Sequence, residues 1–283
     1  MSKRPPASHE RPSTIHDALE RAVLAVRTQR LDEAERLAGD VLKSNRGNVL
    51  AAQVLGQALL LQDRAPDAID PLQRAARRSN DPAIETLLAR ALADAGRGDE
   101  ALDQLRRATA RRPPYPQAFL ELGDQLGKAG RFDEGIAAFE SGLALTPDAA
   151  VLRVGLGYLH LHRNDRARAR DLFLQVRAAA PERHDAPVAL ANVMAMDGDY
   201  AAAAELYRQA LGLRPDDAET QISLAKCLLE MGERGAGEAA LRAAARGRAH
   251  MAGPAVTALA ATPHGRFFLR PSAAAKFLHV AAT

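Results

Sequence analysis

The most constraining feature of this chain is a set of prolines at a constant interval. Pro113, Pro147, Pro181 and Pro215 follow one another at spacings of 34 residues. Each closes a segment of similar pattern, namely GRGDEALDQLRRATARRP, GRFDEGIAAFESGLALTP, NDRARARDLFLQVRAAAP and GDYAAAAELYRQALGLRP. Proline stops a helix because it has no N–H to donate and its ring clashes with the preceding turn. A fixed period of this length is typical of proteins built from stacked repeats.

Each interval is long enough for two short helices. Apolar residues recur at spacings of three and four, as at Leu122 and Leu126, which is the period of an amphipathic helix. Glycine stands where the two helices of a unit meet, and a left-handed turn favours it there: Gly96, Gly130, Gly198 and Gly232. One helix pair cannot bury its own apolar face, so neighbouring pairs must stack into a solenoid.

These units resemble the tetratricopeptide repeat, in the form common among bacterial proteins. The first helices carry a leucine followed by a small residue at Leu55-Gly56, Leu88-Ala89, Leu122-Gly123, Leu156-Gly157, Leu190-Ala191 and Leu224-Ala225. The second helices carry a small residue at Ala34, Ala68, Ala101, Gly135, Ala169, Ala203 and Gly237. An apolar or aromatic residue follows it four positions later at Ala38, Leu72, Leu105, Phe139, Phe173, Tyr207 and Leu241.

The resemblance implies an all-α fold, a right-handed α-α superhelical solenoid of about seven helix-turn-helix units with a C-terminal helical cap. We expect a flexible arm over 1–14 and a repeat region over 15–247, followed by capping helices and a basic tail over 248–283. The seven units expected within the repeat region are 15–48, 49–81, 82–115, 116–149, 150–183, 184–217 and 218–247.

The first unit departs most from the family pattern. Arg21 stands where leucine is expected, and Arg46 stands where the closing proline is expected. Terminal units of a solenoid need a polar outer face, because no neighbour covers them. We therefore expect the first unit to be an end cap.

No catalytic or metal-binding pattern stands out. His160 and His162 are two positions apart on a helix and so point to different faces, whereas a ligand pair on a helix needs a spacing of four. The GLG segment at Gly155 follows no strand, and we interpret Gly157 as a helix-crossing residue. Cys227 is interpreted as a buried small residue. The sequence predicts a protein that is not an enzyme and that uses no cofactor and no metal.

The hydropathy of the chain, its N-terminal residues and its cysteine content indicate where in the cell the protein is located. No stretch approaches the roughly 20 apolar residues of a membrane-spanning helix. The N-terminal residues lack the apolar core of a secretory signal. The chain has a single cysteine, so no disulfide can form within it. These observations favour a cytoplasmic protein.

The resemblance also implies where a partner binds. In the family, positions 2, 5, 9, 12 and 13 of each unit face a concave groove. The groove wall expected to bind a partner comprises Val151, Val154, Tyr158, Leu161, His162, Val188, Asn192, Met196, Ile222 and Lys226. This wall is mainly apolar with scattered polar groups, which suits an extended peptide or an amphipathic helix. No three consecutive units supply the lysines, asparagines and arginine with which family members clamp chaperone tails.

Two functions remain open at this stage. The first is a non-catalytic scaffold that binds a peptide or helix of a partner protein in the groove. The alternative is an accessory or substrate-presenting arm of a modifying enzyme, of the glycosyltransferase or sulfotransferase type, whose catalytic domain is on another chain.

The C-terminal tail is strongly basic. Residues 239–283 contain no acidic residue and carry Arg242, Arg246, Arg248, Arg266, Arg270 and Lys276. We interpret the tail as a cap on the last unit. The other interpretation is a docking element for an acidic partner or an anionic lipid. Nucleic acid is disfavoured, because the net charge of the whole chain is only +3 and aromatic residues make up 4% of it.

Overall fold

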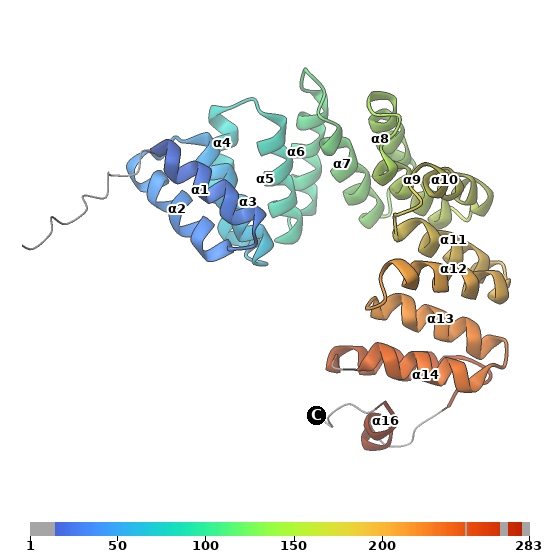
Figure 1. Ribbon diagram of the computed structural model, residues 1–283. Coiled ribbons are helices and arrows are strands. Elements are labelled where there is room, and N and C mark those ends of the chain that lie inside the picture. Colours follow the sequence, from blue (N-terminus) through green and yellow to red (C-terminus); the bar gives the residue numbers. More distant parts are fainter. Residues whose placement is uncertain (1–14, 247, 267–270, 279–283) are drawn as a thin grey trace, which may run out of the picture. The chain divides into compact units, whose positions relative to one another are not determined.

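The computed structural model describes residues 15–246, 248–266 and 271–278 of the chain. It divides into two compact units, residues 1–147 and 148–283. The described residues are folded into helices joined by short turns, and they contain no strand (Figure 1). The arm expected over 1–14 lies outside the described residues.

The first unit contains four antiparallel helix pairs. Their helices are α1 (Ile15–Arg27), α2 (Leu31–Ser44), α3 (Val49–Leu61), α4 (Ala65–Arg78), α5 (Pro82–Asp94), α6 (Gly98–Ala110), α7 (Pro116–Lys128) and α8 (Phe132–Leu145). The first helices of successive pairs contact one another, α1 with α3, α3 with α5, and α5 with α7. The first helices therefore form the inner face of this stack.

The second unit contains three further pairs and a C-terminal extension. Its helices are α9 (Ala150–His162), α10 (Arg166–Ala179), α11 (Asp185–Met196), α12 (Tyr200–Leu213), α13 (Ala218–Glu230), α14 (Arg234–Ala245), the 3₁₀ turn η1 (Ala249–Met251), α15 (Ala252–Ala261) and α16 (Pro271–Leu278). In Figure 1, α12, α13 and α14 lie in successive layers with α16 beyond α14.

Every helix pair is joined by the same kind of turn. One residue with positive φ follows each first helix, and it is Gln29, Asp63, Gly96, Gly130, Asn164, Gly198 or Gly232. The N–H of the next residue reaches back to a carbonyl of the first helix, as in Arg131 N to Leu126 O at 2.9 Å. This is the Schellman arrangement that ends a helix, so the glycines expected at these turns are confirmed in the left-handed conformation.

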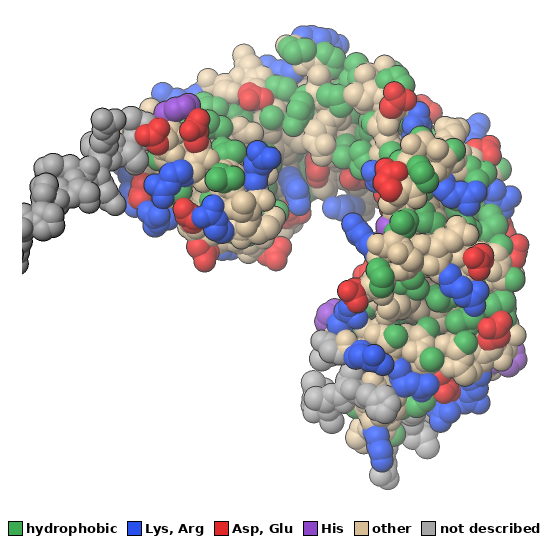
Figure 2. Space-filling view, in the orientation of Figure 1, with side chains coloured by type: hydrophobic (Ala, Val, Ile, Leu, Met, Phe, Trp, Pro, Cys, Tyr) green, Lys and Arg blue, Asp and Glu red, His purple; other side chains and the backbone are tan. Residues whose placement is uncertain are grey.

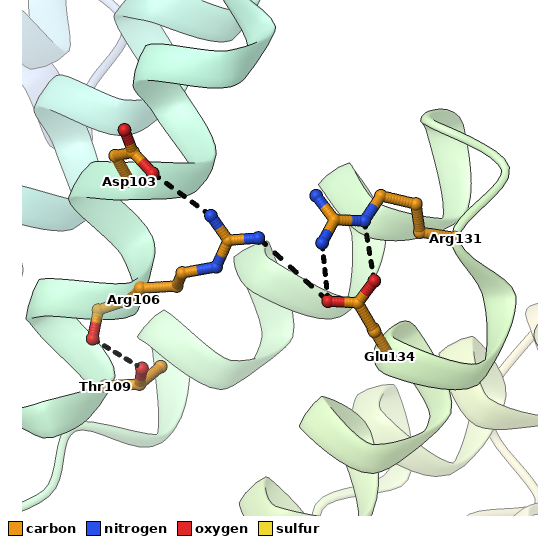
Figure 3. A network of polar contacts seen from close by, with 5 residues as sticks. All are labelled: Asp103, Arg106, Thr109, Arg131 and Glu134. Carbon is orange, nitrogen blue, oxygen red and sulfur yellow. Dashed lines mark hydrogen bonds and ion pairs between the residues drawn. The ribbon is translucent and has the colours of Figure 1, made fainter.

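The second helices begin in two different ways. In the first unit an arginine precedes the helix and pairs with an acid three residues later, as Arg131 does with Glu134 at 2.6 Å. Figure 3 shows this pair together with Arg106 of α6, whose guanidinium lies 3.0 Å from Asp103 and 4.0 Å from Glu134. In the second unit, Asp165 and Asp199 instead accept a backbone N–H as N-caps of α10 and α12.

Close helix crossings place glycine against a bulky side chain. A Cβ atom added to Gly157 of α9 would lie 2.4 Å from the ring of Phe173 on α10, and one added to Gly123 of α7 would lie 2.7 Å from Phe139 on α8. Both phenylalanines are almost completely buried. The small first-helix residues expected from the repeat pattern are thus required by packing within each pair.

The N-terminal end of the first unit exposes both charged and apolar side chains of α1. Arg21 is exposed and lies 3.7 Å from Glu33, whereas the leucines at the same repeat position in α5, α7, α9, α11 and α13 are buried. Leu24 is 50% exposed, although its equivalents Ala58, Ala91 and Leu159 are buried. Both residues occupy the face that a preceding helix pair covers elsewhere in the stack. Arg21 is exposed as an end cap requires, but Ile15, Val23 and Leu24 are exposed on the same helix, so the end cap stays a prediction.

The C-terminal end of the second unit is covered by α15 and α16. Met251, Ala255, Leu259 and Leu278 share one apolar cluster with Leu241 and other residues of α13 and α14. Lysine and arginine side chains gather over this end in Figure 2.

Several of these basic side chains are held by the protein itself. Glu238 is 8% exposed, and one of its carboxylate oxygens lies 3.1 Å from both Arg234 and Arg266. The guanidinium groups of Arg242 and Arg266 also flank the ring of Phe277 at 4.9 and 5.0 Å. These contacts attach α16 to α14, as a cap requires.

Among the described residues, no helix has the length and apolar character needed to cross a membrane.

Candidate functional site

The second unit contains a pocket of about 670 Å³ on the side formed by its first helices. The C-terminal halves of α9, α11 and α13 line it, together with Tyr200 and Tyr207 of α12 and the end of α15 at Ala261 and Thr262. We call it the groove pocket. The helix α15 follows the seven expected units, so a segment beyond residue 247 supplies one wall of this site.

A hydrogen bond between α11 and α12 lies at the floor of the groove pocket. The hydroxyl of Tyr207 donates to the side-chain oxygen of Asn192 at 2.5 Å. Burial raises the pKa of Tyr158, while a hydrogen bond from Asn192 lowers it in part. Burial raises the pKa of Tyr207 strongly, and a hydrogen bond from Ser223 acts in the opposite direction. Both phenols are therefore neutral hydrogen-bonding groups at physiological pH.

The walls of the groove pocket are mostly apolar. Leu161, Ala195, Met196 and Ala261 contribute to them. The ring of Tyr158 packs against that of Phe173 with centroids 5.4 Å apart and an interplanar angle of 60°. This tilted contact fixes the orientation of the Tyr158 ring, because the buried Phe173 cannot move away from it. Met196 is 47% exposed and can adapt to a ligand.

Two charged residues stand at the rim. Lys226 and Glu230 are four residues apart on α13, and both line the groove pocket. Within the described part of the chain, neither has an ion-pair partner within 4 Å. Charges left without a partner at the mouth of a pocket are available to a ligand.

Six of the expected groove residues meet in this pocket: Tyr158, Leu161, His162, Asn192, Met196 and Lys226. Val151, Val154 and Val188 lie nearer the N-terminal ends of α9 and α11 and do not line it. Val151 is nevertheless 45% exposed, and Val154 and Val188 are half-buried.

The expectation that Ile222 lines the groove is corrected by its burial. Ile222 is only 6% exposed and belongs to the apolar cluster formed with α15. Val154 and Val188, at the equivalent positions of the two preceding units, are half-buried and pack against clusters that include residues of the following first helix. The seven expected units ended at residue 247, so the sequence analysis placed no such helix against Ile222.

Several residues of the groove pocket were not expected from the sequence. They are Ala195, Tyr200, Tyr207, Ser223, Cys227, Glu230, Ala261 and Thr262. Ala195 and Glu230 occupy positions 12 and 13 of their units and follow from the repeat register. Tyr200 and Tyr207 belong to a second helix, and nothing in the repeat pattern places a second-helix residue in the groove.

Reactive groups in and near this site have structural partners. His160 is 7% exposed, and its Nδ1 atom lies 3.6 Å from Asp165. Cys227 is 3% exposed, and burial raises the pKa of its thiol to about 11. A thiol with a raised pKa is a poor nucleophile, so the interpretation of Cys227 as a packing residue agrees with its burial. Among the described residues, no group of three histidine, cysteine or acidic side chains is arranged to hold a metal ion.

The chain matches two sequence profiles described as tetratricopeptide repeat. One matches residues 86–150, 120–184 and 154–218, and the other matches residues 194–261, so together they cover more than half of the chain. The chain belongs to the tetratricopeptide repeat family. Residues 27–108 of this tetratricopeptide repeat protein also match a profile described as anaphase-promoting complex, cyclosome, subunit 3.

The chain is similar to the small glutamine-rich tetratricopeptide repeat-containing protein 2 of Mycosarcoma maydis. It is 27% identical to this tetratricopeptide repeat protein over 115 residues, which are 41% of this chain and 30% of the relative. The match thus spans less than a third of the relative's length.

Two solved structures have the same fold. A tetratricopeptide repeat protein from Parabacteroides merdae covers 86% of this chain and 98% of its own, with a TM-score of 0.69 and 15% identity. PilW, described as a widely conserved type IV pilus biogenesis factor, covers 75% of this chain and 98% of its own, with a TM-score of 0.66 and 20% identity. The solenoid fold expected from the sequence is confirmed by this likeness.

Proposed function

We propose that this protein is an interaction scaffold that binds a peptide or helix of a partner protein on the inner face of its second unit. The observation that carries the proposal is the groove pocket. It combines an apolar wall, a hydrogen-bonded floor and two rim charges without ion-pair partners on the face formed by the first helices. Binding sites for short ligands are typically concave and mainly apolar with a few placed polar groups.

The apolar surface of this face extends beyond the pocket. Val151 and Met196 are 45% and 47% exposed, although both are apolar. Val154, on the same helix as Val151, and Val188, on the same helix as Met196, are half-buried. A bound segment that covers these side chains removes apolar area from water at roughly 25 cal/mol per Å² before the cost of ordering the segment is subtracted.

Membership of the family supports a role in protein binding in general. PilW, which has the same fold, is described as a type IV pilus biogenesis factor. The fold is not a guide to the partner, because one fold hosts many functions. The partner is therefore proposed only as a peptide or helix whose chemistry matches the groove.

A peptide-display selection against the whole protein would test the proposal. Selected peptides should bind the wild-type protein and lose affinity for Met196→Glu, which places a charge on the exposed groove wall. Leu174→Glu is the matched control, because Leu174 is a 38% exposed apolar residue on the second helix α10. Peptides that bind Met196→Glu as well as wild type, or that lose affinity equally for both variants, would contradict the proposal.

A further inference from the structure

The groove pocket has the volume of a ligand site, and its base is formed by buried side chains. Its volume of about 670 Å³ falls within the range of about 300–1,000 Å³ typical of ligand pockets. Tyr207 and Cys227 at its base are each 3% exposed, so the base lies well below the rim formed by Met196 and Lys226. A peptide reaches such a base only with a long or bulky side chain.

We propose that an aromatic side chain with a polar tip, that of tryptophan or tyrosine, anchors the bound segment in the groove pocket, with an acidic residue beside it that faces Lys226. This inference rests on the proposed function, because it specifies the segment that the groove binds. Three properties of the pocket support it.

The first property is the aromatic and sulfur content of the walls. Tyr158 and Tyr200 enter from different helices, α9 and α12, and Met196 enters from α11. Aromatic rings pair favourably in tilted or offset arrangements beyond the gain from buried area. A methionine sulfur adds a favourable contact with a ring edge. These contacts favour a ring over an aliphatic side chain of the same size.

The second property is the polar base. The Tyr207 hydroxyl donates a hydrogen bond to Asn192, and Ser223 lines the same pocket. The hydroxyl oxygens at the base retain lone pairs that an indole N–H or a phenol O–H can use. A leucine or phenylalanine side chain would cover these oxygens without giving them a partner, which costs free energy.

The third property is the charge at the rim. Lys226 and Glu230 are separated by one helical turn and have no ion pair within the described residues. A segment with a carboxylate beside its anchor satisfies Lys226, and a cation one turn further along satisfies Glu230. Opposed charges of this kind fix the direction in which a segment binds.

Methionine-methyl NMR of the whole protein offers a direct test. The chain has five methionines, of which Met196 lines the pocket, whereas Met251 is 8% exposed in the cluster between α13 and α15. N-acetyl-L-tryptophanamide should produce a saturable ring-current shift of the Met196 methyl and leave Met251 unchanged. N-acetyl-L-leucinamide should bind at least about tenfold more weakly, a difference of about 1.4 kcal/mol. The chain contains no tryptophan, so indole fluorescence reports the same binding without background.

Two variants identify the site and the charge preference. Ala195→Leu adds bulk to the pocket wall and should reduce the affinity for the tryptophan probe, whereas Ala201→Leu on the exposed side of α12 should not. Wild type should prefer N-acetyl-Asp-Trp-amide over N-acetyl-Lys-Trp-amide, and Lys226→Glu should reverse this preference. Native methyl spectra of each variant show that it is folded.

The outcomes separate this inference from the proposed function. Equal responses of Met196 to the tryptophan and leucine probes, or no response to either, would overturn the aromatic anchor. If display-selected peptides still lose affinity for Met196→Glu in that case, the proposed groove function stands without the anchor. If the probe binds and Ala195→Leu blocks it, but Met196→Glu leaves peptide binding intact, the pocket takes up a small aromatic molecule only, and the proposed groove function fails together with the anchor.

Discussion

The hydroxyl of Tyr207 lies 2.5 Å from the side-chain oxygen of Asn192 and donates a hydrogen bond to it. Tyr207 belongs to a second helix, and Asn192 belongs to the first helix of the same pair. Asn192 is therefore already engaged in holding α11 and α12 together at the base of the groove pocket. Substitution of Asn192 would disturb this packing as well as binding, so exposed residues such as Met196 are better tests of function.

Removal of this hydrogen bond should lower stability. Tyr207→Phe keeps the ring and leaves the Asn192 oxygen without its donor, at a cost of about 1–3 kcal/mol. Tyr200→Phe is the matched control, because Tyr200 lines the same pocket with no described hydrogen bond on its hydroxyl. Urea unfolding of the two variants measures the difference. Equal stabilities would mean that the Tyr207–Asn192 contact contributes nothing to the fold.

Two glycines should respond to alanine in opposite directions. Gly157→Ala places a methyl group 2.4 Å from the buried Phe173 ring and should destabilise the second unit by about 1–3 kcal/mol. Gly39 lies inside α2 with no atom within 4 Å of an added Cβ, so Gly39→Ala should stabilise the protein by about 1 kcal/mol. Thermal unfolding followed by circular dichroism shows whether each variant is more or less stable than wild type. A stabilised Gly157→Ala variant would show that the assigned crossing of α9 and α10 is incorrect.

The N-cap of α13 should make stability depend on pH. Asp217 accepts hydrogen bonds from the hydroxyl of Thr220 at 2.5 Å and from the N–H of Glu219 at 3.2 Å. Partial burial raises the pKa of Asp217, but the bonds from Thr220 and nearby groups outweigh it and hold the pKa below its usual value.

A carboxyl group whose pKa is lower in the folded than in the unfolded protein stabilises the fold at pH values above its unfolded-state pKa. This stabilisation is lost as the pH falls through the folded-state pKa. Asn retains a capping oxygen but has no charge, so Asp217→Asn should cost about 0.3–1 kcal/mol at pH 7, and the difference from wild type should shrink below about pH 4. Asp216→Asn is the control, because the Asp216 side chain is fully exposed. A difference for Asp217→Asn that is constant from pH 7 to pH 3 would exclude the carboxylate as its source.

The attachment of α16 should depend on Glu238. Glu238→Gln removes the charge that holds Arg234 and Arg266, and hydrogen exchange over 271–278 should become faster. The expected loss of stability is about 1–3 kcal/mol, since hydrogen bonds to a charged group of low exposure are broken. Glu205→Gln on α12 should have little effect, because its pair with Arg208 is on the surface. Unchanged exchange over 271–278 would show that the apolar cluster alone holds the cap.

The repeat pattern predicted the parts of the fold that recur from unit to unit. The spacing of Pro113, Pro147, Pro181 and Pro215 predicted the helix pairs, and Gly157 was correctly interpreted as a crossing residue because the physical demand for a small side chain repeats. The features that differ between units were not predictable in this way. Arginine–acid pairs stand at the start of the second helices of the first unit, which have no side-chain cap, whereas aspartate side chains cap α10 and α12.

The groove was predicted only where its wall comes from the repeats. Tyr158, Asn192 and Met196 follow from the register, and the groove pocket contains all three. Tyr207 and Thr262 do not follow from it, because one comes from a second helix and the other from a segment beyond the seven expected units. Ile222 shows the same limit, since its burial depends on α15, which also lies beyond those seven units.

The central claim is that the partner binds the inner face of the second unit and not its basic end. The dissociation constant of one display-selected peptide should be measured for wild type, for Met196→Glu and for the double variant Arg246→Glu/Lys276→Glu, in which two exposed cations of the basic end are reversed. We expect Met196→Glu to weaken binding by about 30-fold, which corresponds to a loss of about 2 kcal/mol at a central contact, and the double variant to change it less than about twofold. A peptide that binds Met196→Glu normally and loses its affinity for the double variant would contradict the account and place the site at the basic end.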